Sequence, residues 1–567
     1  MGVPGLWSQL APHPAPTSFS CLAAPLFTSP QYGLRLGIDM SIWLIELDHA
    51  SRTNHYMLEP VIERIFDRIC TLLRSGVLPF FIFDGPGRPS VKRNHRSSYG
   101  GGQLTSLEAR VLPLLDLLGV PWRRAPGEAE AELAAVLRRG ELDAILTDDS
   151  DALAFGAHTI IRYTSHLGAT PSKASTTRTP PSSNPTTTSK PTLPSKTISK
   201  SAAPRSISVF RTAELNGGLT PAAFILVGVL CGGDYGAGVR GLGILTALAL
   251  AKAGFGDALL SAEGDIRALS EWRSSVAKQL ANNTNQLLSR KEPTLARRIL
   301  ELQDFPSPAI LASYTSPLIS SHLPPPSWST PLDAKGVSQY AMDTFGWRDP
   351  ARAKRLAKAL WPALFVVELR RAAMEVGLQI PSPPLPLSPL SHSYCISSLF
   401  DISSPLKTNF TTTDGVAAFG VQFHSAIFCT HSNLPPSSIT SPTASSDYNV
   451  GLPVVWMSRA FLVAERNANQ VVLQWEEGGR RQEVSKERTA AARRARLANE
   501  RVRVERERAR ADSDSDRASA EMMTPSASSR FGERKVSPFG KSLFIFSLCR
   551  LFGTSQTEHS HGTPASG

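Results

Sequence analysis

Continuous apolar runs that end on aspartate are the clearest pattern along this chain. The runs with the length and composition of buried strands are residues 34–38 (LRLGI), 79–83 (PFFIF) and 144–146 (AIL). Asp39 follows the first run, Asp84 follows the second, and Asp149 and Asp151 lie just beyond the third. Because ligands collect outside the carboxyl ends of strands in an open α/β sheet, we expect these aspartates to meet at one edge.

Helical periodicity separates these strand candidates. Apolar residues recur at helical spacing over residues 61–73 and 107–118, and further helices are expected at 222–230 and 244–253. The stretch that ends at Tyr32 is polar and contains prolines. Strands that alternate with helices predict an α/β fold with a largely parallel central sheet.

A second group of acids opens the helix that follows Pro126. Glu128 and Glu130 lie in its first turn, and its apolar face includes Leu133 and Leu137. Crowded carboxylates repel one another and raise one another's pKa values, and a hard divalent cation relieves this repulsion. Oxygen-only ligands favour Mg²⁺, Mn²⁺ or Ca²⁺ over zinc. The alternatives are a solvated acidic surface and, for a single aspartate after a strand, a turn or cap residue.

A glycine-rich segment follows the helix expected at 222–230. That helix ends in the sequence GGDY, which adds Asp234 to the acidic candidates, and the sequence GVRGLG comes next. Glycines in such a turn let backbone N–H groups approach a phosphate, helped by the N-terminus of the next helix. The candidate DNA-contacting residues of this hairpin are Gly238, Arg240, Gly241 and Gly243.

Basic residues lie just past Asp84. They are Arg88, Lys92, Arg93 and Arg96. Positive charge beside a metal site suits a scissile phosphate, whose charge must be neutralised as it is attacked. The alternative is a solvated basic loop.

The composition favours a polyanionic partner. The chain of 567 residues is long enough for two or more domains, and 60 Lys and Arg against 48 Asp and Glu give a net charge of +12. A basic chain with a concentrated acidic site suggests nucleic acid and metal-assisted chemistry. The 6 cysteines form no CxxC pair, which argues against a zinc site or a disulfide framework. No apolar run reaches the length of a membrane span, and no signal peptide is expected.

Shifts in composition divide the chain. Residues 165–206 are rich in Ser, Thr and Pro and are expected to be a disordered insertion, with 376–450 as a disordered linker and 513–567 as a disordered tail. Alternating polarity at 451–478 suggests a small β module. A basic helix is expected at 479–512, where arginine and glutamate dominate.

Together these motifs resemble the XPG/flap-endonuclease superfamily of structure-specific nucleases. The sequence MGVPGLW at the start looks like its N-terminal signature, and residues 238–243 look like its helix-two-turn-helix. The segments that look like its acidic blocks are residues 37–43, 82–85, 127–131, 147–151 and 232–235. The resemblance covers residues 1–256 and is interrupted by the insertion.

Some features are most similar to the Holliday-junction resolvase (GEN/Yen) branch of this superfamily. They are residues 37–43, the short segment between Asp84 and Glu128, and the sequence FGW that ends at Trp347. Resolvases of this kind carry a chromodomain-like module after the core, and residues 451–478 are the candidate for it. The tail has no Gln-x-x-Leu-x-x-Phe-Phe clamp-binding motif, which flap endonucleases usually have.

The resemblance implies a PIN-like (5′-3′ exonuclease-like) α/β core that uses two divalent metals. By it, the ordered regions are an N-terminal nuclease region at 1–105, an internal acidic region at 106–164, a helix-two-turn-helix region at 207–260 and a helical extension at 261–375. The implied metal-binding and catalytic residues are Asp39, Asp84, Glu128, Glu130, Asp149, Asp151 and Asp234, with Lys92 and Arg93 as phosphate contacts. The neighbouring acids Asp148 and Glu132 are left out of this set.

The cofactors and partners follow from the same resemblance. Two Mg²⁺ ions, for which Mn²⁺ substitutes, would activate a water and stabilise the leaving oxygen of a phosphodiester. A K⁺ ion would bind backbone carbonyls of the hairpin. The substrate would be branched double-stranded DNA in the nucleus, contacted by the hairpin, Arg88 and Arg96, with a homodimer on four-way junctions and no membrane.

Three functions stay open. The first is an endonuclease of repair and recombination that cuts four-way junctions and 5′ flaps. The second is a flap or gap nuclease of replication or excision repair. The third, from another class, is a DNA-binding scaffold without catalysis. The full acidic set argues against the third, because carboxylates without a metal would repel one another and DNA.

Overall fold

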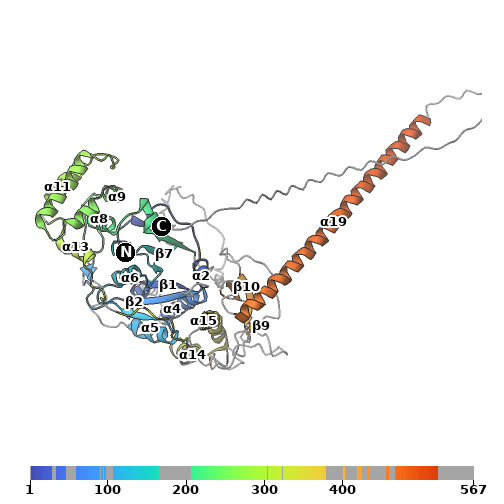
Figure 1. Cartoon of the computed structure of the whole chain (residues 1–567), viewed down its shortest axis with the longest axis horizontal. Helices are drawn as coiled ribbons and strands as arrows, with labels where there is room; N and C mark the ends of the chain where they lie inside the picture. Colours follow the sequence, from blue (N-terminus) through green and yellow to red (C-terminus); the bar gives the residue numbers. More distant parts are fainter. Residues whose placement is uncertain are drawn as a thin grey trace, which may run out of the picture. The chain divides into compact units, whose positions relative to one another are not determined.

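A computed structural model of the chain is shown in Figure 1. It describes residues 2–27, 33–45, 59–89, 91–92, 95–96, 106–164, 206–302, 304–321, 323–377, 400–401, 418–423, 429, 432, 455–458, 461 and 466–521. Residues up to Gln482 form one compact unit, and residues from Glu483 form a second. The insertion expected at 165–206 lies outside the described residues except for Ser206, and so does the tail beyond Glu521.

A six-stranded sheet in the order β5-β2-β1-β6-β7-β8 forms the centre of the first unit. Its strands are β1 (Leu34–Asp39), β2 (Val77–Phe83), β5 (Trp122–Arg124), β6 (Ala144–Leu146), β7 (Thr159–Tyr163) and β8 (Ile207–Arg211). All neighbours pair in parallel except β7 and β8, which are antiparallel. The predicted α/β class with a largely parallel sheet is confirmed.

The strands are apolar throughout because both faces of the sheet are covered. In β2, Phe81 and Phe83 pack into one hydrophobic cluster, while Phe80 and Ile82 pack into another. Successive side chains of a strand point to opposite faces, so a strand between two cores reads as a continuous apolar run. This is why the run at 79–83 lacks polar alternation.

Helices from distant parts of the chain cover one face of the sheet. They are α2 (Phe19–Phe27), α4 (Glu59–Arg74), α5 (Ser106–Leu117), α14 (Ala334–Thr344) and α15 (Pro350–Gly377). Trp347 is 1% exposed and donates its Nε1–H to Glu63 at 3.1 Å, and Trp361 is 2% exposed. Both tryptophans therefore serve packing, and α4 and α15 lie side by side (Figure 1).

Shorter helices build the second core on the opposite face. They are α1 (Leu6–Gln9), α6 (Ala129–Arg138), α7 (Asp151–Ala154), the 3-10 helix η2 (Thr212–Gly217), α8 (Pro221–Cys231), α9 (Ile244–Lys252), α10 (Phe255–Ser261), α11 (Ile266–Asn282), α12 (Pro293–Glu301) and α13 (Pro308–Thr315). Thr220 caps α8 by accepting a hydrogen bond from Ala223 N at 3.2 Å. The predicted pair of helices around the glycine hairpin is confirmed as α8 and α9.

Two local expectations differ from the structure near the N-terminus. The stretch before Tyr32 contains helix α2, whose Phe19, Ala23 and Phe27 are spaced for one buried face despite Pro25. The basic segment after Asp84 is not only a loop. It contains a short antiparallel pair, β3 (Val91–Lys92) and β4 (His95–Arg96).

The C-terminal elements also differ from the expected boundaries. The segment predicted as a linker contains β9 (Phe400–Asp401) and β10 (Ala418–Phe423), and β10 pairs with β11 (Val455–Ser458). The apolar run at 470–475 is helical rather than a strand, because it belongs to α19 (Arg466–Glu521). A short apolar run does not distinguish a strand from a helix by periodicity alone. The division of the chain into functional domains stays a prediction.

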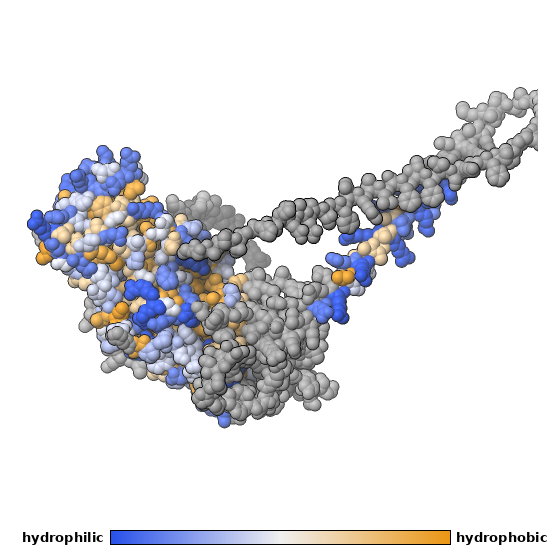
Figure 2. All heavy atoms as spheres, in the orientation of Figure 1, coloured by the Kyte–Doolittle hydropathy of each residue, from blue (hydrophilic) through white to orange (hydrophobic). Residues whose placement is uncertain are grey.

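Helix α19 is longer than the basic helix expected at 479–512. Its side chains from 484 to 511 are exposed. Figure 2 shows a largely hydrophilic surface along its described part, interrupted by a few apolar spots. Leu497 in this helix is 53% exposed. Among the described residues, no single helix is long and apolar enough to cross a membrane. Among these residues, only α9 and α10 taken together have the length and apolar composition of a membrane span, and they are bent by 73° relative to each other.

Glycines in the hairpin between α8 and α9 differ in what they require. Gly238 has φ +69°, and a Cβ there would overlap the backbone of Gly232 and Cys231, whereas Gly243 has open space around it. We therefore expect Gly238→Ala to lower the free energy of unfolding by roughly 2–4 kcal/mol. The matched control Gly243→Ala should change it by less than about 0.5 kcal/mol. Thermal and urea unfolding measure both, and equal effects would contradict this packing.

Candidate active site

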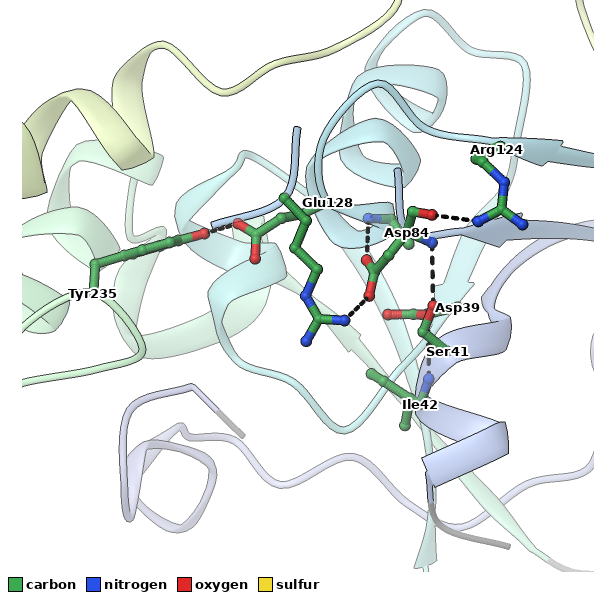
Figure 3. Close-up of polar contacts among 9 residues, drawn as sticks. Asp39, Ser41, Ile42, Asp84, Arg124, Glu128 and Tyr235 are labelled. Atoms are coloured by element: carbon green, nitrogen blue, oxygen red, sulfur yellow. Dashed lines mark hydrogen bonds and ion pairs between the residues drawn. The ribbon is translucent and has the colours of Figure 1, made fainter. Parts of the chain in front are cut away.

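Asp39 and Asp84 lie side by side because their strands are neighbours. Asp39 is the last residue of β1 and pairs in register with Ile82 of β2. It is 3% exposed, and its Oδ1 accepts a hydrogen bond from Ile42 N at 3.2 Å. Asp84 N donates to Ser41 Oγ at 3.1 Å (Figure 3). The parallel register thus brings two predicted acids to the carboxyl edge of the sheet.

The start of α6 lies against Asp84. The Oδ1 atom of Asp84 accepts a hydrogen bond from Ala129 N at 3.0 Å. Glu128, the N-cap of α6, and Glu130, in its first turn, are 6% and 7% exposed. The positive end of a helix dipole favours carboxylates at this position. The predicted acidic helix start is therefore joined directly to the second strand end.

Glycine permits this close approach. Gly85 N donates to Gly127 O at 2.7 Å, and a Cβ on Gly85 would overlap the carbonyl group of Ala125. Arg124 secures the same turn, because its Nη1 donates to the backbone oxygen of Asp84 at 2.8 Å. The Asp-Gly pair after β2 is thus needed for the turn as well as for its carboxylate.

Asp149 and Asp151 occupy the turn after β6. They are 0% and 2% exposed. Asp149 N donates to Thr147 Oγ1 at 3.0 Å, and Asp149 Oδ1 accepts from Asp151 N at 2.9 Å. The second bond orients the Asp149 carboxylate, and the two bonds together fix the backbone of the turn. The third strand end therefore also carries buried acids, as predicted.

The N-terminal segment packs on this acidic turn. Val3 N donates to Ser150 Oγ at 2.7 Å. Gly2 has φ +70°, and a Cβ there would lie 2.5 Å from Asp149 Oδ1. The start of the chain is therefore part of the site's wall, which explains why small residues stand there.

Asp234 reaches the site from the end of α8. It is 5% exposed, and a Cβ on the neighbouring Gly233 would lie 3.9 Å from Asp151 Oδ1. The hydroxyl of Tyr235 donates a hydrogen bond to Glu128 Oε2 (Figure 3). The turn after α8 thus joins the third strand end to the start of α6.

The pKa of the Tyr235 hydroxyl reflects the negative charge gathered at this site. Burial raises the pKa of its hydroxyl far above the ordinary value, and the charges of Glu128, Glu130 and Asp151 raise it further. A phenolate would be repelled by these carboxylates, so the hydroxyl keeps its proton and acts as a donor.

The acids left out of the predicted set have structural partners. Arg162 Nε binds Asp148 Oδ1 at 2.8 Å, and the guanidinium of Arg162 lies over the ring of Trp7 at 4.4 Å from its centroid. Glu132 is fully buried and accepts a hydrogen bond from Ser320 N at 2.7 Å. These contacts tie Asp148 and Glu132 to the fold.

The donor set fits a hard divalent cation. All predicted ligands are carboxylates, most are nearly buried, and they converge from separate elements on one edge. Within the described part of the chain, however, no group of three His, Cys, Asp or Glu side chains is arranged closely enough to hold one ion. A protein contact directs one of the donors elsewhere, because Arg88 Nη1 binds Asp84 Oδ2 at 2.6 Å. A cation would redirect this carboxylate, since carboxylate oxygens are the preferred ligands of Mg²⁺.

Only one of the predicted basic residues after Asp84 is placed at the acids. Arg88 contacts Asp84, and its side chain is 16% exposed. Lys92 and Arg96 lie in β3 and β4, but their side chains are outside the described residues, as is all of Arg93. Their roles as phosphate contacts stay predictions.

The predicted DNA-contacting hairpin presents its backbone at the surface. Arg240, Gly241 and Gly243 are exposed, and Gly238 is half-buried. The backbone oxygen of Arg240 accepts a hydrogen bond from Arg298 of α12. Arg298 was not predicted from the sequence, because its pairing with the hairpin spans a long stretch of chain.

Further residues at the site were also missed. Ser41, Arg124, Ser150 and Tyr235 hold the acidic turns through the hydrogen bonds described above. Tyr235, Ser41 and Ser150 stand inside the acidic blocks, so their positions carried a signal, whereas Arg124 shows none without the fold.

The sheet carries buried carboxylates at its carboxyl edge, and a glycine hairpin between two helices lies beside them. These features place the chain in the class of α/β proteins with a PIN-like nuclease fold. Comparisons with known proteins agree. The family model for the XPG N-terminal domain matches residues 1–99, and that for the XPG I-region matches residues 119–234. Residues 1–99 and 119–234 thus carry the two XPG regions of the XPG/flap-endonuclease superfamily, and the similarities point to its GEN branch.

Individual relatives show the extent of this similarity. Human "Flap endonuclease GEN homolog 1" is 28% identical over 178 residues, which is 29% of this chain and 18% of the relative. "Flap endonuclease GEN-like 1" of Arabidopsis thaliana is 31% identical over 185 residues, 29% of each chain. The chain therefore matches less than a third of the length of these relatives. The solved structure "eukaryotic junction-resolving enzyme GEN-1 binding with Cesium" is 25% identical with a TM-score of 0.59, covering 84% of this chain and 100% of that one.

The ion pair of Arg88 with Asp84 generates a prediction for cation binding. Arg88→Met removes a positive charge from the acidic edge, so we expect Mn²⁺ to bind at least about 3-fold more tightly. Electron paramagnetic resonance of free Mn²⁺ measures this affinity. Arg211→Met, which removes an exposed arginine paired with Glu214 at 3.8 Å, is the control and should have no effect. Weaker Mn²⁺ binding by the Arg88 variant would contradict the prediction.

Proposed function

We propose that this chain is a divalent-metal-dependent, structure-specific endonuclease that hydrolyses phosphodiester bonds in branched DNA. The observation that carries the proposal is the meeting of buried carboxylates from β1, β2, α6, the turn after β6 and the end of α8. Such a set suits metal-assisted hydrolysis of a phosphodiester. Similarity to relatives named flap endonucleases supports 5′ flaps as substrates, and similarity to the solved structure of a junction-resolving enzyme supports four-way junctions.

The metal-holding residues are the acidic set described above: Asp39, Asp84, Glu128, Glu130, Asp149, Asp151 and Asp234. Two Mg²⁺ ions, which Mn²⁺ can replace, would supply an activated water and charge stabilisation of the leaving oxygen. The protein's own part is to hold these carboxylates at fixed strand and helix ends. The Asp149 carboxylate, for example, accepts a hydrogen bond from Asp151 N within their turn.

Basic and backbone groups beside the acids would bind the DNA. Arg88 lies within reach of the acidic edge, and Lys92, Arg93 and Arg96 follow it in the chain. The exposed hairpin of Gly238, Arg240, Gly241 and Gly243 presents backbone groups of the kind that contact phosphates. These contacts read the backbone and its bends rather than base sequence.

Several finer assignments belong to the same proposal. A K⁺ ion would bind carbonyls of the hairpin, and the solved structure of a junction-resolving enzyme binding caesium supports a monovalent site in this fold. The enzyme would act in the nucleus in repair and recombination. Two copies would assemble on a four-way junction, because paired cuts need two active sites.

A flap or gap nuclease of replication or excision repair is the second candidate. Relatives named "Flap endonuclease 1" favour it, such as one from Staphylothermus marinus that is 27% identical over 218 residues. The same acidic set serves both activities, so substrate choice must come from parts of the chain that contact DNA. A scaffold without catalysis is disfavoured, because buried acids alone would repel DNA.

Paired substitutions test the catalytic proposal. Asp149→Asn removes a metal ligand, and we expect it to lower cleavage of end-labelled four-way-junction and 5′-flap DNA by roughly 10³-fold or more while DNA binding remains. Asp148→Asn, at the adjacent aspartate that binds Arg162, is the matched control and should keep most of the activity. Chelation with EDTA should abolish cleavage by the unmodified chain.

The cleavage patterns distinguish the candidates. Paired symmetrical nicks across the junction support a resolvase. Cleavage of the flap without cleavage of the junction would support a flap or gap nuclease of replication or excision repair. Full activity of Asp149→Asn contradicts the metal assignment, and binding without cleavage of either substrate by the unmodified chain would favour the scaffold.

A further inference from the structure

A column of packed aromatic rings ends on a carboxylate of the acidic edge. Phe155, just after α7, lies 6.1 Å from Tyr314 of α13, measured between ring centroids. Tyr314 in turn packs edge-on against Tyr235, with ring centroids 4.7 Å apart and an interplanar angle of 90°. The hydroxyl at the far end of Tyr235 donates to Glu128 Oε2, as Figure 3 shows. Rings from three elements thus fix one carboxylate.

The local sequence makes room for this column. A Cβ on Gly228 or on Gly233 would lie 2.8 Å from the hydroxyl oxygen of Tyr314. A Cβ on Gly236 would lie 2.7 Å from Ile310 of the same helix α13. Tyr314 is 3% exposed. The glycines around Asp234 therefore admit α13 against the acidic block, and this contact holds the Tyr235 ring in place.

We propose that Tyr235 is a positioning residue of the metal site: its hydroxyl orients the Glu128 carboxylate, and Tyr314 of α13 orients the Tyr235 ring. The inference rests on the metal site of the proposed function. A carboxylate that is held through one oxygen presents the other in a fixed direction, and ligands supported in this way bind metal more tightly. Tyr235 itself touches neither metal nor substrate in this role.

The role has a physical reason in this site. Glu128 lies at the N-cap of α6, where its backbone is extended, with φ −89° and ψ 140°. Its side chain has several rotatable bonds, so an unsupported carboxylate would lose rotamer freedom when a cation binds. The hydrogen bond from Tyr235 restricts that freedom in advance. Helix α13, which comes from the helical extension, is thereby linked to metal binding at the sheet edge.

Mn²⁺ binding to the full chain tests the inference without using catalysis. Tyr235→Phe keeps the ring and removes only the hydroxyl, and we expect it to weaken Mn²⁺ binding by roughly 10- to 100-fold. Tyr314→Leu removes the ring that supports Tyr235 and should weaken binding in the same direction by a smaller factor. Electron paramagnetic resonance gives the affinities, and thermal unfolding without metal confirms that each variant is folded.

Tyr340→Phe is the matched control. The Tyr340 hydroxyl donates to the backbone oxygen of Arg110 at 2.6 Å, a bond that joins α14 to α5 and does not involve the acidic set, so its loss should leave Mn²⁺ affinity unchanged. A folded Tyr235→Phe with the affinity of the unmodified chain would overturn the positioning role and leave the proposed function standing. Failure of the unmodified chain to bind Mn²⁺ would overturn both.

Discussion

Repulsion among buried carboxylates at the carboxyl edge of the sheet is the constraint on which the rest of this structure depends. Two unit charges about 4 Å apart interact by roughly 4 kcal/mol at an effective dielectric constant of 20. Hydrogen bonds from Ala129 N and Tyr235, and the ion pair of Arg88 with Asp84, offset part of this repulsion. A divalent cation would offset the remainder of the repulsion. Cation binding would therefore also stabilise this edge of the sheet.

The fold holds this edge from both faces of the sheet. Alternate side chains of β2 enter two separate cores, so the strand ends cannot move apart without disturbing both. The N-terminal segment packs against Asp149, and the turn after α8 packs against Asp151. Glycine at Gly2, Gly85 and Gly233 permits these approaches. The backbone next to each acidic block therefore lines the site itself, and the acids need no long supporting loops.

The acids and their strands could be predicted from the sequence, since continuous apolar runs ending on aspartate have few other interpretations. The contacts that direct those acids could not. The pairing of Tyr235 with Glu128 joins residues 107 positions apart, and no local pattern signals it. Likewise, the strand at 418–423 has its partner at 455–458, beyond a long polar segment. Helix α19 also extends past both expected ends, over residues 466–478 and 513–521, where arginine and glutamate no longer dominate.

Crystals of the full chain soaked in Mn²⁺ would test the central claim most directly, because anomalous scattering locates each ion independently of activity. The account predicts two Mn²⁺ peaks among the oxygens of the acidic set, with Asp84 released from Arg88. Absence of a peak at this edge, with Asp84 still paired to Arg88 and Mn²⁺ bound elsewhere, would contradict the account.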